Sequence, residues 1–162
     1  MHIKQFGHLA FNCKNLQKSV AFYRDILGFK EKFCFKYDAF TEIVKNSGVK
    51  VPKLAYKYLE KKKNKVWLTY LELGDGIFIE LFDQIGAVIA HRPIFFHNNY
   101  QHFAIIVDDI NKTKADLISK GVNIDIDISF GPDKTYQMWI HDPDGNKIEI
   151  MQYTENSFQI NY

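Results

Sequence analysis

Two histidines and two glutamates occur in matching settings in the two halves of the chain. His8 lies within residues 6–11 (FGHLAF), and His102 lies within residues 100–105 (YQHFAI). Glu80 lies within residues 75–81 (DGIFIEL), and Glu149 lies within residues 144–150 (DGNKIEI). The first pair is 72 residues apart and the second 47, so the first repeat is 25 residues longer. Two imidazoles and two carboxylates on a duplicated scaffold predict one divalent metal ion that is bound from both halves.

Alternating polarity around these four residues supports the same interpretation. Ile77, Ile79 and Leu81 would point to one side of a strand, while Glu80 and the phenylalanines on either side of it would point to the other. The apolar neighbours of His8, His102 and Glu149 likewise fall on the opposite side from the candidate ligand. An ionised glutamate between two phenylalanines is costly to bury without a partner, and a cation would be that partner.

To position these residues, each half is predicted to fold as strand–helix–strand–strand–strand. In the first half the strands are expected near 3–11, 29–37, 66–73 and 76–83, and a helix is expected from Asn15 to the stop at Gly28. In the second half the strands are expected near 101–107, 123–129, 135–141 and 146–153, with a helix over about 110–120. The fold class is therefore α+β, with two tandem βαβββ modules. The modules are predicted to span residues 1–94 and 95–153, and residues 154–162 are expected to form a loose tail.

The extra length of the first module falls in an insertion at about 37–65, predicted to be largely irregular. Phe40, Ile43 and Val44 have helical spacing. The second part is rich in lysine, at positions 50, 53, 57, 61, 62, 63 and 65. Such a charge run is typical of a solvated surface insertion. The alternative is a lid over the site that attracts an anionic substrate.

Composition excludes several classes of function. The 162 residues carry a net charge of +2, and the only arginines are Arg24 and Arg92, so nucleic-acid binding is not expected. No apolar run approaches the roughly 20 residues that span a bilayer, and no signal-peptide pattern precedes the first strand. Cys13 and Cys34 lack metal-binding or redox spacing. We therefore expect a cytoplasmic protein that binds a small-molecule substrate and neither nucleic acid nor membrane.

Three motifs in this chain resemble those of the vicinal oxygen chelate superfamily, the group of glyoxalase I, bleomycin-resistance proteins and extradiol dioxygenases. They are His8 followed by residues 22–29 (FYRDILGF), the strand around Glu80, and residues 142–149 (DPDGNKIE). The resemblance covers nearly the whole chain apart from the insertion and the tail. It implies two modules that curl as a mixed sheet around a metal-holding cup, with His8, Glu80, His102 and Glu149 as ligands.

The ligand order His, Glu, His, Glu resembles that of glyoxalase I most closely. The resemblance also leaves two alternatives: an Fe(II) extradiol-type dioxygenase, whose relatives use His, His and Glu, and a non-catalytic protein that sequesters a drug or metabolite. Glutathione-using relatives commonly carry an arginine where this chain has Asn12, and often an asparagine where it has Gln84. These departures imply that the thiol carrier or the whole substrate differs.

A mixed nitrogen and oxygen donor set suits Ni, Co, Zn, Mn or Fe(II). Such a metal polarises a carbonyl and favours removal of a proton from the adjacent carbon. Glu149 is the first candidate for the base and Glu80 its partner on the opposite side; in the alternative, Glu149 is only a ligand. The expected activity is that of a metal-dependent glyoxalase I-like lyase or isomerase, acting on a hemithioacetal of a 2-oxoaldehyde. Exposed sheet edges favour a homodimer.

Overall fold

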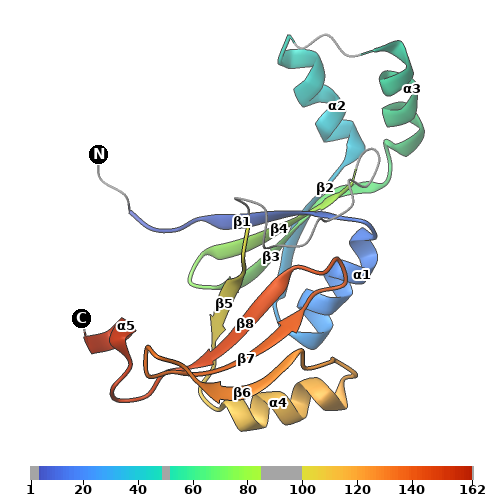
Figure 1. The fold of residues 1–162 in the computed structure, drawn as a ribbon. Coiled ribbons are helices and arrows are strands. Elements are labelled where there is room, and N and C mark those ends of the chain that lie inside the picture. Colours follow the sequence, from blue (N-terminus) through green and yellow to red (C-terminus); the bar gives the residue numbers. More distant parts are fainter. Residues whose placement is uncertain (1–3, 49–51, 85–99, 162) are drawn as a thin grey trace. The chain divides into compact units, whose positions relative to one another are not determined.

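The computed structural model describes residues 4–48, 52–84 and 100–161 (Figure 1). The chain divides into two compact units, residues 1–87 and residues 88–162, and each unit is described by itself. The predicted module boundary between residues 94 and 95 lies outside the described residues. Each unit contains one four-stranded mixed sheet and one helix between its first two strands, which confirms the predicted α+β class with two βαβββ modules.

In unit 1 the four strands are β1 (His8–Cys13), β2 (Lys30–Lys36), β3 (Val66–Gly74) and β4 (Ile77–Asp83). They lie in the order β1-β4-β3-β2, with β1 parallel to β4 and the other pairs antiparallel. The predicted helix is α1 (Leu16–Ala21) followed by one π-helical turn, η1 (Phe22–Ile26). The Asn15 side chain caps α1 by accepting from the Lys18 amide at 3.1 Å.

Unit 2 repeats this topology with shorter connections. Its strands are β5 (Phe103–Ile106), β6 (Ile126–Phe130), β7 (Tyr136–His141) and β8 (Lys147–Gln152), in the order β5-β8-β7-β6. Helix α4 (Ile110–Ser119) is capped by Asp109, whose carboxylate accepts from the Lys112 amide at 2.9 Å. Asn15 and Asp109 thus cap the corresponding helices of the two units in the same way, which explains why each helix starts where it does.

One face of each sheet packs on its helix and forms the apolar core of that unit. In unit 1 this face carries Leu71, Ile79 and Leu81, whose exposure is 1% or less. In unit 2 it carries residues that are equally buried: Met138, Ile140, Ile148 and Ile150. Because side chains alternate along a strand, the residues between these apolar positions lie on the opposite face, where the candidate ligands are.

The insertion is helical rather than irregular as predicted. It forms α2 (Tyr37–Asn46) and α3 (Lys53–Lys62), which pack on each other, and α2 also contacts β2 and β3 (Figure 1). A partly buried polar contact joins both helices to the end of β4. The Tyr37 hydroxyl donates to Asp83 Oδ2 at 2.6 Å, and Lys62 Nζ donates to the same oxygen at 2.7 Å. The helical spacing of Phe40, Ile43 and Val44 was thus a stronger signal than the lysines that follow it.

The C-terminal segment was predicted to be a loose tail, and this prediction was wrong for residues 154–161. Residues Phe158–Asn161 form α5, and Ser157 is fully buried. The Ser157 hydroxyl donates to the Lys134 carbonyl at 2.9 Å, and the Phe158 amide donates to the Asp133 carbonyl at 3.0 Å. None of the helices in the described ranges is long and apolar enough to cross a membrane.

Candidate metal centre

In unit 1 the structure brings together the histidine and the glutamate that were singled out from the sequence. His8 Nε2 lies 3.6 Å from Glu80 Oε1. The glutamate side chain is only 7% exposed, whereas the histidine is 51% exposed. Glu80 is therefore buried within this face of the sheet, whereas His8, at the start of β1, is about half exposed.

Unit 2 contains an equivalent pair. His102 Nε2 lies 3.2 Å from Glu149 Oε2, and the side chains are 36% and 9% exposed. As in unit 1, the carboxylate is buried and the imidazole is more accessible. Among the residues that the structure describes, no group of three or more His, Cys, Asp or Glu side chains is found within either unit that could hold a metal ion. Each unit therefore contains one His–Glu pair of candidate ligands.

The two pairs arise from one strand register. In unit 1, Ala10 of β1 is the partner of Glu80 on β4, and in unit 2, Ala104 of β5 is the partner of Glu149 on β8. Each histidine lies two residues before its alanine, on the same face of the strand. The imidazole of each histidine lies within 3.6 Å of that glutamate in unit 1 and 3.2 Å in unit 2. The same parallel pairing thus places a histidine beside a buried carboxylate in both halves.

An aromatic residue occupies the third strand at the same level in both units. Tyr70 of β3 is the partner of Glu80, and Trp139 of β7 is the partner of Glu149. The His8 and Tyr70 rings are 6.4 Å apart, edge to face, and the His102 and Trp139 rings are 4.8 Å apart in the same geometry. Tyr70 and Trp139 therefore hold equivalent positions in the two sheets. Their equivalence was also detectable in the sequence, because each lies ten residues before its glutamate.

The electrostatics of the unit 2 pair follow from its burial. Burial raises the pKa of the Glu149 carboxyl above its ordinary range, the neighbouring His102 acts in the opposite direction, and Asp133 adds to the rise. A buried carboxylate that is stabilised by protonation would also be stabilised by binding a cation.

Unit 2 contains a further histidine–carboxylate pair that sequence reasoning missed: His141 Nδ1 lies 2.8 Å from Asp125 Oδ2. That pair is substantially exposed.

The turn before β8 fixes the position of Glu149. The Asp142 side chain is 2% exposed, and its Oδ1 accepts from the amides of Asp144 at 2.9 Å and Asn146 at 2.8 Å. Its Oδ2 accepts from the Asn146 side-chain amide at 2.8 Å, and Gly145 takes the positive φ of 88° that the turn requires. The DPDGN motif is therefore a hydrogen-bonded loop that sets the register of the strand carrying Glu149.

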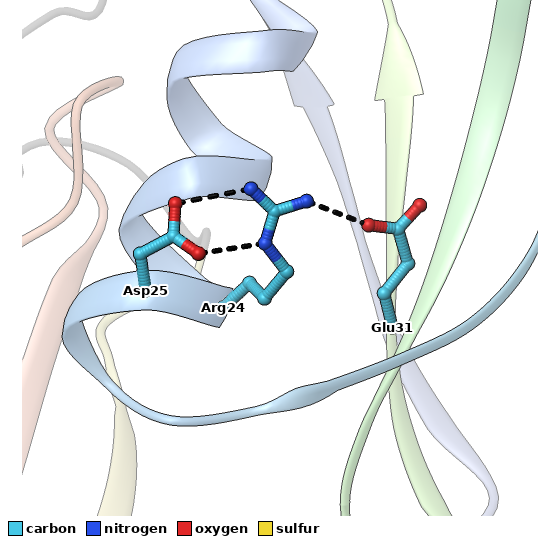
Figure 2. A network of polar contacts seen from close by, with 3 residues as sticks. All are labelled: Arg24, Asp25 and Glu31. Carbon is cyan, nitrogen blue, oxygen red and sulfur yellow. Dashed lines mark hydrogen bonds and ion pairs between the residues drawn. The ribbon is translucent and has the colours of Figure 1, made fainter.

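Arg24 forms a polar network with two carboxylates (Figure 2). Its Nε and Nη2 donate to the two oxygens of Asp25 at 2.7 and 3.0 Å, and its Nη1 donates to Glu31 Oε2 at 2.9 Å. The guanidinium links η1 to the start of β2. Three of its N–H groups are therefore used within unit 1.

Comparison with known proteins agrees with this architecture. The model of the Glyoxalase/Bleomycin resistance protein/Dioxygenase superfamily matches residues 5–150, and the chain belongs to this superfamily. Among curated protein sequences, the comparison finds no significant match.

Solved structures share the fold at low sequence identity. A lactoylglutathione lyase from Agrobacterium tumefaciens has a TM-score of 0.56 at 20% identity, over 93% of this chain and 94% of that one. A glyoxalase/dioxygenase from Nostoc punctiforme has a TM-score of 0.63 at 21% identity, over 94% and 92%. TioX from Micromonospora sp. ML1 has a TM-score of 0.58 at 12% identity, over 93% and 99%. Identities this low establish the fold alone.

We expect Asp142→Ala to lower the free energy of unfolding by about 2–3 kcal/mol, because it leaves buried donors of the turn without an acceptor. Asp108→Ala is the control, since Asp108 is exposed, and it should change the value by less than about 0.5 kcal/mol. Urea unfolding followed by circular dichroism measures both. Equal stability of the two variants would show that the turn does not fix β8.

Proposed function

We propose that this protein is a metal-dependent lyase or isomerase of glyoxalase I type, which transfers a proton from the carbon next to a carbonyl group. His8, Glu80, His102 and Glu149 are the proposed ligands of one divalent metal ion. The observation that supports this proposal is the repetition of one His–Glu pair, in the same register, on the corresponding face of each sheet.

The donor set fits a divalent metal of the first transition series. It offers two imidazole nitrogens and two carboxylates, the mixture that suits Ni, Co, Zn, Mn or Fe(II). Both carboxylates are buried beside a more accessible imidazole, so a cation would compensate charge that the fold has withdrawn from water. Two negative charges on the ligands would also neutralise the dication.

When bound, the metal would supply Lewis acidity that polarises the carbonyl of the substrate. Glu149 is the proposed base. It accepts the proton from the carbon next to the carbonyl and returns it to the neighbouring carbon. On a hemithioacetal of a 2-oxoaldehyde, this transfer from C1 to C2 yields a 2-hydroxyacyl thioester. Glu80 is the equivalent residue of the other unit and the proposed partner on the opposite side.

The thiol that forms the hemithioacetal is proposed not to be glutathione. Asn12 stands where glutathione-using relatives commonly have an arginine, and Gln84 stands where they often have an asparagine. Arg24 already donates to the carboxylates of Asp25 and Glu31, which offset its charge (Figure 2). Among the lysines of the insertion, Lys62 is likewise paired, with Asp83.

Elemental analysis of the purified protein tests the metal site. We expect about one divalent ion per chain in the wild type, since four donors define one site. His102→Ala and Glu149→Gln should each lose most of it, because second-unit donors are then missing. His141→Ala is the matched control, as it removes a unit 2 histidine that is not a proposed ligand. Equal metal content in all four proteins would contradict the proposed site.

Activity is tested with methylglyoxal and a panel of low-molecular-weight thiols, following thioester formation. We expect metal-dependent turnover with a thiol other than glutathione, and a loss of at least about 100-fold in Glu149→Gln, because this variant lacks both the proposed base and a proposed metal ligand. Robust turnover with glutathione would contradict the proposal on the thiol. Absence of turnover with every thiol, together with tight binding of an unrelated small molecule, would favour a sequestering function.

The protein is also proposed to form a homodimer. β1 and β2 are the edges of one sheet, and β5 and β6 are the edges of the other. Open edges of this kind are usually covered or paired. Light scattering should give about twice the 19.0 kDa of one chain at micromolar concentration. A mass of one chain would contradict this prediction.

A further inference from the structure

A single cross-strand row connects the unit 1 carboxylate to the edge of its sheet. Ala10, Glu80, Tyr70 and Phe33 are successive partners on β1, β4, β3 and β2. Residues paired in this way project from the same face. The row that contains the candidate ligand Glu80 therefore continues outward through two aromatic side chains.

The aromatic end of this row is stacked and accessible. The rings of Phe33 and Tyr70 are 4.4 Å apart with an interplanar angle of 26°. Phe78 packs edge-on against Tyr70 at 5.9 Å, and Phe35 packs edge-on against Phe33 at 5.6 Å. Phe33 and Phe35 remain 46% and 43% exposed. Four uncharged rings thus form one continuous surface, which begins beside the His8–Glu80 pair and ends in exposed phenylalanine.

Unit 2 has the corresponding row with a different end. Ala104, Glu149, Trp139 and Ile126 are its successive partners. The position that corresponds to Phe33 is Ile126, which offers apolar area but no ring face. Lys147 Nζ also lies 5.6 Å from the centre of the Trp139 ring, so a cation already lies over that aromatic. The two rows are alike at the carboxylate and differ where the rest of a substrate would lie.

We propose that the substrate carries a flat aromatic group, which binds on the Phe33–Tyr70 surface of unit 1 while its oxygen atoms reach the His8–Glu80 pair. This inference rests on the proposed function and names the substrate class for that site. Neighbouring strands are about 4.8 Å apart, so Phe33 on β2 is about 10 Å from Glu80 on β4. The aromatic group is therefore separated from the chelating oxygens by a short linker, or belongs to a fused ring system. Phe33 and Tyr70 determine specificity and do not take part in proton transfer.

Two hydroxamates that share a metal-chelating head test this proposal. Acetohydroxamate carries only a methyl group, and 2-naphthohydroxamate carries a fused aromatic body. Calorimetric titration of the zinc-loaded wild type should give the naphthyl compound an affinity at least about tenfold higher, the scale expected from aromatic contact and apolar burial. Phe33→Ala should remove most of this difference and leave the affinity for acetohydroxamate unchanged. Phe33→Leu should recover part of it.

Ile126→Ala is the matched control, because it truncates the equivalent position of the unit 2 row. It should retain the preference for the naphthyl compound. Loss of the preference in Ile126→Ala but not in Phe33→Ala would overturn the assignment to unit 1. Equal binding of the two hydroxamates to wild-type protein that holds zinc would overturn the aromatic surface as a substrate site.

Metal content, measured on the same samples, separates this inference from the proposed function. A wild-type preparation that takes up no zinc contradicts the proposed function, whereas one that holds zinc but does not distinguish the hydroxamates contradicts only the inference. A second copy of the chain is the other candidate occupant of the surface. If Phe33→Ala changes the mass measured by light scattering and leaves both affinities unchanged, the surface is an interface between copies and the inference is overturned.

Discussion

The arrangement on which the rest depends is a glutamate withdrawn from water beside a histidine, formed once in each unit. The Glu80 and Glu149 side chains are 7% and 9% exposed. An imidazole nitrogen lies 3.6 Å from the Glu80 carboxylate and another lies 3.2 Å from the Glu149 carboxylate. Burying a carboxylate costs several kcal/mol unless a charge or a set of hydrogen bonds compensates for it. Because the fold retains this cost twice, in the same register, we propose that one dication compensates for both charges.

The elements around each pair hold it in place. A capped helix covers the apolar face, and the parallel pairing of the first and last strands brings the histidine to the glutamate. In unit 2, Asp142 closes the turn that starts β8. In unit 1, the end of β4 is joined through Asp83 to Tyr37 and Lys62 of the helical insertion. The insertion is therefore attached to the strand that carries Glu80, three residues beyond it.

Much of this could be predicted from the sequence, because the signals are local or repeated. Strand alternation placed the glutamates opposite the core residues, and the duplicated His and Glu settings identified the pairs that the structure brings together. Tyr70 and Trp139 could have been matched by their equal spacing from the glutamates. Phe33 could not, because β2 and β3 shift register between Glu31 and Phe33, and such a bulge has no clear sequence signal. The C-terminal segment was missed because its order comes from tertiary hydrogen bonds to residues 133 and 134.

The central claim is that one metal ion is shared by both units, and X-ray absorption spectroscopy of the zinc-loaded protein tests it most directly. The account predicts two imidazoles per zinc in the wild type, with oxygen for the remaining ligands and no sulfur. In His8→Ala and in His102→Ala, either one imidazole remains or zinc is lost. A wild-type spectrum with one imidazole, or a zinc environment that is unchanged in either variant, would contradict a site built from both halves of the chain.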